Sequence, residues 1–117
     1  MQEQIAAELR EKRESVVLLM VERIPSEQTA DERRQFISGF VDLVIAAAEG
    51  NTSPRDEYLA VVIPGCKAAG LDFGYIVSAM VPVSMALAAS VSTDSLGWCA
   101  TFCMDYTQRL IATWQKS

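Results

Sequence analysis

Histidine is absent from the 117 residues of this chain. Its absence excludes nucleophilic triads that use histidine as the base, zinc sites that need an imidazole, and haem held by a proximal histidine. Cysteine is scarce, and three residues cannot all pair within one disulfide framework. With six glycines and four prolines, the composition also excludes collagen-like and low-complexity structure.

Basic residues are in the minority, since ten lysines and arginines stand against fifteen aspartates and glutamates. The net charge is −5, and no basic residue lies between Lys67 and Arg109. A nucleic-acid-binding protein normally carries a basic surface, because neutralising phosphates dominates its affinity. We therefore expect no nucleic-acid partner.

Apolar residues recur at helical spacing throughout the chain, and no stretch alternates as a surface strand does. The length suits one compact domain over residues 1–117, with no linker. We predict an all-α fold, a bundle of five helices joined by short loops. The expected helices span roughly residues 3–24, 29–49, 53–69, 72–91 and 93–117.

Start and stop signals divide these helices. Pro25 should end the first, and Gly50 and Gly70 are placed for left-handed C-terminal positions. The expected start signals are the Thr29–Glu32 capping box, Ser53 before Pro54, Asp72, and Ser92 or Thr93.

Two prolines fall inside expected helices. Pro64, followed by Gly65, predicts a kink or a short break in the third helix. Pro82 predicts a bend in the fourth.

Residues 73–93 contain no charge, and 21 residues are enough to span a bilayer. The stretch nevertheless holds Gly74, Pro82 and four serines, and no lysine or arginine flanks it. We interpret it as a helix buried in the middle of a bundle, and expect no membrane partner.

Cys99 and Cys103 lie four residues apart on one helical face, and Cys66 follows the Pro64–Gly65 pair. Three thiolates do not complete a zinc site, so the expected role is that of small buried hydrophobes. The alternative is a redox-sensitive Cys66 at a helix start that lowers its pKa. An odd cysteine count and a polar amino terminus favour the cytoplasm.

No catalytic constellation is evident. The acidic pairs Asp31–Glu32 and Asp56–Glu57 fall in expected first turns, where carboxylates complement the helix dipole. Glycines occur singly, without a phosphate-binding loop. We predict neither enzymatic activity nor a cofactor.

Methionines and helix-interior prolines together suggest a pocket for a small apolar ligand. Its lining would be Cys66, Met80, Met85, Cys103 and Met104. The alternative is that these are ordinary core residues.

Residues 16–21 are apolar without a break, and aromatic residues recur every four positions along the last helix. This is more apolar surface than one side of a small bundle must bury, so we predict a homodimer. The predicted interface residues are Val17, Met20, Val21, Leu110 and Trp114. Alanine at Trp114 would then weaken association by more than about 1 kcal/mol.

Three segments, Leu9–Val17, Arg33–Gly50 and Lys67–Val77, resemble the amino-terminal domains of stressosome scaffold (RsbR-type) proteins. The resemblance implies an all-helical, dimeric sensory domain, globin-like without haem in some members, that precedes a STAS output domain. Its last helix would transmit the signal. The resemblance transfers no individual functional residue.

Two functions are therefore carried forward. The leading one is a non-catalytic sensor and dimerisation domain belonging to a longer regulatory protein. The alternative is a stand-alone carrier or receptor for a small apolar ligand.

Overall fold

The computed structural model describes residues 2–23 and 30–117, in which every regular element is a helix. The all-α prediction is confirmed for these ranges. The helices are α1 (Gln2–Glu11), α2 (Arg13–Arg23), α3 (Ala30–Ala48), α4 (Ser53–Ala68), α5 (Phe73–Ser90) and α6 (Thr93–Lys116).

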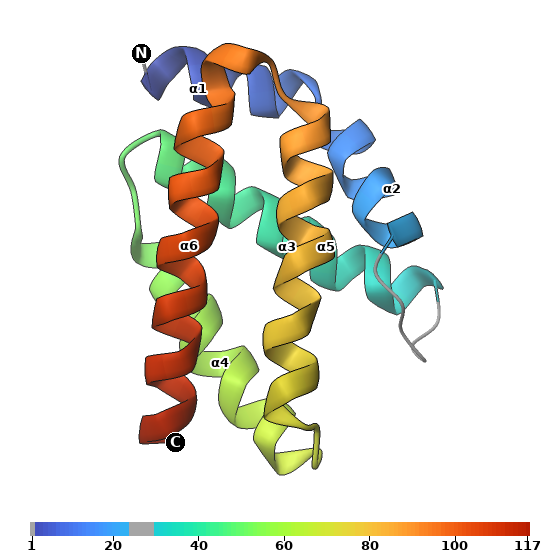
Figure 1. The fold of residues 1–117 in the computed structure, drawn as a ribbon, viewed down its shortest axis with the longest axis vertical. Coiled ribbons are helices and arrows are strands. Elements are labelled where there is room, and N and C mark those ends of the chain that lie inside the picture. Colours follow the sequence, from blue (N-terminus) through green and yellow to red (C-terminus); the bar gives the residue numbers. More distant parts are fainter. Residues whose placement is uncertain (1, 24–29) are drawn as a thin grey trace.

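The helices form two layers (Figure 1). The antiparallel pair α5 and α6 lies in front of α3 and α4, while α1 crosses one end and α2 descends beside α5. The molecule measures 39 × 28 × 19 Å. Its shortest dimension has room for two helix layers only, because packed helix axes lie about 10 Å apart. The α5–α6 pair is therefore one whole face of the molecule.

The first predicted helix is instead two helices, so the described residues form six helices rather than five. The chain turns at Lys12, although backbone hydrogen bonds continue from Lys12 N–H to Glu8 C=O (3.0 Å) and from Val16 N–H to Lys12 C=O (2.9 Å). The physical reason is packing: α1 packs against α3, while α2 packs against both α3 and α5. One straight helix could not make both sets of contacts.

The prolines do not interrupt their helices. α4 continues through Pro64 to Ala68, so of the predicted kink or short break, the break is wrong. Pro64 and Ala60, whose carbonyl loses its usual amide partner, are both exposed, so water can reach that carbonyl. Pro82 likewise lies inside α5.

Most of the predicted stop and start signals are confirmed. Gly50 and Gly70 have φ of +93° and +78°, and the Asp72 carboxylate accepts the Tyr75 N–H at 3.2 Å. The cap of α4 is Thr52 rather than Ser53, whose N–H donates to the side chain of Asn51. The signals expected at Pro25 and Thr29 lie outside the described residues.

The core lies between the two layers. Its largest fully buried side chains are Leu9, Met20, Leu43, Ile63 and Leu87. The aromatic series of α6 is confirmed, because Trp98 stacks on Phe102 at 5.4 Å and Phe102 on Tyr106 at 6.0 Å. Tyr106 also lies edge-on to Phe40 of α3, with ring centroids 5.1 Å apart, and this contact connects α6 to the layer behind it.

Candidate functional site

α5 is exposed along one side, contrary to the prediction of a helix buried on all sides. It is long and apolar enough to cross a membrane, but only 22% of its 18 residues are buried in the fold. Met80, Val83, Ala86 and Leu87 are its buried residues. They contribute to the core, so this side of α5 is already occupied.

The uncovered sides of α5 and α6 follow a strict four–three spacing, typical of helices that pack along a seam. We call these ten residues the outer face: Gly74, Ser78, Val81, Met85 and Ala88 of α5, with Gly97, Thr101, Met104, Gln108 and Ile111 of α6. Ile111 is half-buried and the other nine are exposed. Its exposed large apolar side chains are Val81 (61%), Met85 (59%) and Met104 (68%).

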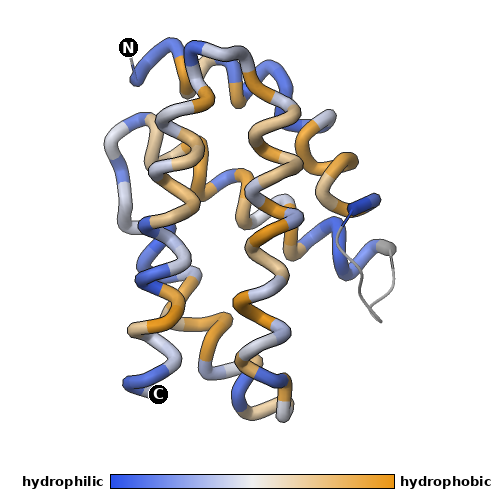
Figure 2. The backbone as a smooth tube through the Cα atoms, viewed as in Figure 1, coloured by the Kyte–Doolittle hydropathy of each residue, from blue (hydrophilic) through white to orange (hydrophobic). Residues whose placement is uncertain are grey.

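Charge is almost missing from this part of the chain. Asp94 carries the only charge among residues 73–104. Figure 2 shows no strongly hydrophilic segment along α5, whereas α1 and the start of α3 are markedly hydrophilic. Exposed apolar surface with so few charges is typical of the centre of a protein interface.

The residues predicted to line a ligand pocket do not surround one. Met80 and Cys103 are in the core, and Cys66 is half-buried in α4. Met85 and Met104 lie on the outer face, on the opposite side of their helices. The structure therefore divides these residues between core and surface.

The residues predicted for a dimer interface are mostly enclosed within one chain. Val17, Met20 and Leu110 are buried in the core of the single protomer, so they are unavailable to a partner and their assignment was wrong. Val21 and Trp114 are half-buried. Trp114 stacks on Phe73 with ring centroids 5.1 Å apart, which gives it an intramolecular role.

The cysteines have no sign of reactivity. Burial raises the pKa of the Cys99 thiol to about 12 and also raises the pKa of Cys66 and Cys103. Cys66 lies within α4 rather than at a helix start, so the expectation of a lowered pKa was wrong. Cys99 and Cys103 are small buried hydrophobes as expected, whereas Cys66 is half-buried.

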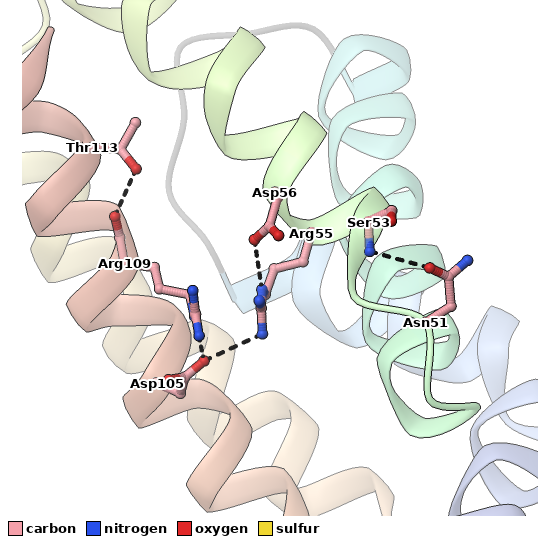
Figure 3. A network of polar contacts seen from close by, with 7 residues as sticks. All are labelled: Asn51, Ser53, Arg55, Asp56, Asp105, Arg109 and Thr113. Carbon is pink, nitrogen blue, oxygen red and sulfur yellow. Dashed lines mark hydrogen bonds and ion pairs between the residues drawn. The ribbon is translucent and has the colours of Figure 1, made fainter.

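A buried arginine joins α4 to α6 (Figure 3). The guanidinium of Arg55 donates to Asp56 at 3.1 Å and to Asp105 at 3.4 Å, and Arg109 donates to the same Asp105 at 2.8 Å. Helical periodicity gave no sign of this group. Arg55 stands one residue before an acidic pair in a first turn, where an exposed side chain is the ordinary expectation.

Glu8 makes a second polar connection between distant parts of the chain. Its carboxylate pairs with Lys12 at 2.6 Å and also reaches the start of α6. It accepts the Ser92 N–H at 2.7 Å, the Ser92 hydroxyl at 2.9 Å and the Ser95 hydroxyl at 2.5 Å. These bonds, led by the one from Lys12, lower the pKa of Glu8 to about 2.

Two surface hollows lie elsewhere. The larger, about 450 Å³, opens between α3 and α4, and its apolar walls include Gly39, Leu43, Tyr58 and Val61. The smaller, about 220 Å³, lies between α4 and α6 beside Arg109. Neither is lined by a residue of the predicted pocket.

Within residues 2–23 and 30–117, no group of three or more cysteines, aspartates or glutamates is placed to hold a metal ion. Comparison with protein-family models, curated proteins and solved structures found no match to the chain. The outer face is therefore the candidate functional site on physical grounds.

Proposed function

We propose that this chain is a non-catalytic regulatory domain that forms a homodimer through its outer face and transmits a signal along α6. The observation that carries the proposal is the pair of uncharged, exposed seams on α5 and α6. The resemblance to stressosome scaffold amino-terminal domains supports a sensory role before a STAS-like output domain. A globin-like arrangement without haem and a cytoplasmic location belong to the same proposal.

The size of the outer face supports a specific interface. Helices of 18 and 24 residues, each about 10 Å wide, present roughly 600 Å² in projection. Side-chain relief increases the accessible area beyond the projection, and a standard interface takes about 800 Å² from each partner. Burial of this surface would remove three large apolar side chains from water.

α6 is suited to transmitting a signal because one of its sides packs in the core of its own chain and the other faces the proposed partner. One side holds Cys103, Tyr106 and Leu110 in the core, and the other presents Met104 to a partner. A change in association at the outer face therefore acts on a helix that is rigidly packed against α4 and α5.

Sedimentation velocity on the wild type and on Met104→Glu tests this function. We expect a dimer at tens of micromolar for the wild type. The variant should dimerise at least tenfold more weakly, because two buried carboxylates would face an apolar surface. Hydrogen exchange on the same samples should show faster exchange of α6 amides in the variant.

Val61→Glu is the matched control, because Val61 is 74% exposed on α4 and outside the outer face. It should leave the dimer unchanged. A wild type that stays monomeric at several hundred micromolar would remove the basis of the proposal.

A stand-alone carrier for a small apolar ligand is the second candidate. The apolar hollow between α3 and α4 favours it, although its location differs from the pocket predicted from sequence. Native mass spectrometry would support this function by detecting a retained small molecule on wild type that Val61→Glu releases.

A further inference from the structure

We infer that two copies of the chain pack antiparallel through the outer face, with the two-fold axis crossing the seams near Val81 and Thr101. The inference rests on the proposed dimer and specifies its geometry. It follows from the relief of the face and from the charges at its edge.

The large and small residues of the outer face are arranged diagonally. Residues equally distant from the α5–α6 turn lie at about the same height, because both helices rise about 1.5 Å per residue. Met85 therefore lies level with Gly97, and Met104 lies level with Ser78. On α5 the large side chains lie in the half nearer the α5–α6 turn and the small ones in the other half. On α6 this order is reversed.

Such a face is complementary to its own copy. A two-fold axis perpendicular to the helices places Met85 of one protomer against Ser78 of the other. It also brings Met104 close to Gly97 of the second copy. An axis parallel to the helices would also place protruding on recessed residues, so relief by itself leaves two arrangements.

Charge at the edge of the face selects between them. In the antiparallel arrangement, Asp94 at the start of α6 lies level with Arg109 of the second copy, whose exposed guanidinium also pairs with Asp105 of its own chain at 2.8 Å. In the other arrangement the two Asp94 residues share one end, where neither hairpin has a basic residue and Lys12, which directly follows α1 at the same end, is already paired with Glu8. An exposed ion pair adds little to affinity but favours one relative orientation of the two chains. Orientation is what distinguishes the two arrangements.

Cysteine crosslinking in a Cys66→Ser background tests the geometry. Val81→Cys should form a disulfide-linked dimer on mild oxidation, because Val81 meets its own copy at the axis within disulfide reach. A mixture of Ser78→Cys and Met85→Cys chains should crosslink between the two types more than within either. Val61→Cys, exposed on α4, is the control that should stay unlinked.

Spin labels at Lys116→Cys in the same background give an independent measurement. The antiparallel arrangement places the two positions roughly 45 Å apart, since each lies about 15 residues from the axis along α6. The alternative arrangement places them within roughly 25 Å.

The outcomes separate geometry from function. A dimer by sedimentation that gives a short label distance and no Val81→Cys crosslink overturns the antiparallel inference and leaves the proposed dimer intact. A monomer overturns both. Flotation of the chain with vesicles of neutral phospholipid, abolished by Met104→Glu, would assign the face to a membrane and overturn both as well.

Discussion

At the scale of single residues, Glu8 shows how one carboxylate can connect distant parts of the chain. Ser92 is the cap of α6, yet its side chain bonds to Glu8 instead of capping its own helix. The Glu8 carboxylate, from a residue 84 positions earlier in the chain, accepts the N–H of Ser92 itself in a charge-assisted hydrogen bond. The start of α6 and the end of α1 are thereby held together.

Replacement of Glu8 by glutamine should lower the free energy of unfolding by about 1–2 kcal/mol at pH 7, because charge-assisted bonds to two serines and Lys12 are weakened. The folded pKa of about 2 lies below 4.5, the ordinary value of a glutamate carboxyl. The contribution is therefore complete above pH 4.5 and is lost as the pH falls toward 2. Urea denaturation at pH 7 and pH 3 measures the difference.

Glu11→Gln is the matched control, since Glu11 is exposed on the same helix. It should change stability little at either pH. Equal losses in the two variants, or a Glu8→Gln loss that is the same at both pH values, would contradict the assigned role.

At the scale of helices, α4 and α6 are joined by an ionic contact with a buried member. Asp105 accepts from both Arg55 and Arg109, and Arg55 is the more enclosed of the two bases. Loss of the Asp105 charge leaves buried Arg55 with Asp56 alone, at 3.1 Å, so its charge is less well compensated. Replacing Arg55 by an apolar side chain of similar length removes the buried charge itself and leaves Asp105 paired with Arg109.

Asp105→Asn should therefore destabilise the fold by about 1–3 kcal/mol, and Arg55→Met should change it by less than about 1 kcal/mol. Thermal and urea denaturation of the two variants measure this contrast. The idea fails if Arg55→Met proves the more damaging change, because that would mean the charge itself stabilises the α4–α6 contact.

At the scale of the whole molecule, a two-layer fold with an uncharged outer face should be stabilised by dimerisation. The melting temperature of the wild type should rise by several degrees between about 1 and 100 µM protein, because a folded dimer is favoured by mass action. Scanning calorimetry across this range measures the shift. Met104→Glu should melt at the same temperature throughout, and a flat wild-type curve would argue against coupled association.

Local signals predicted much of this architecture. Gly50, Gly70 and Asp72 mark helix ends in the sequence and in the structure, because φ above zero and amide capping depend on adjacent residues. The four-residue aromatic spacing of α6 was interpreted as part of a dimer interface, whereas Phe102, Tyr106 and Leu110 are buried in the core. The turn at Lys12 was missed, because it depends on which helices α1 and α2 contact.

The candidate site was predicted only in part. Met80 and Met85 are chemically identical and lie five residues apart, yet one is buried and the other exposed. In a helix apolar on all sides, periodicity cannot indicate which side is covered. The predicted dimer residues on α2 and the end of α6 were assigned to the outside for the same reason.

The amino-acid sequence by itself determined that this chain is helical, where most of its helices begin and end, and that histidine chemistry is absent, because these properties depend on neighbouring residues and on composition. Only the tertiary structure decided that Val17 and Leu110 are internal, that Glu8 reaches Ser92, and that Val81, Met85 and Met104 are exposed together on α5 and α6. The reason is geometric: the side of each helix that remains exposed depends on how all the helices pack together.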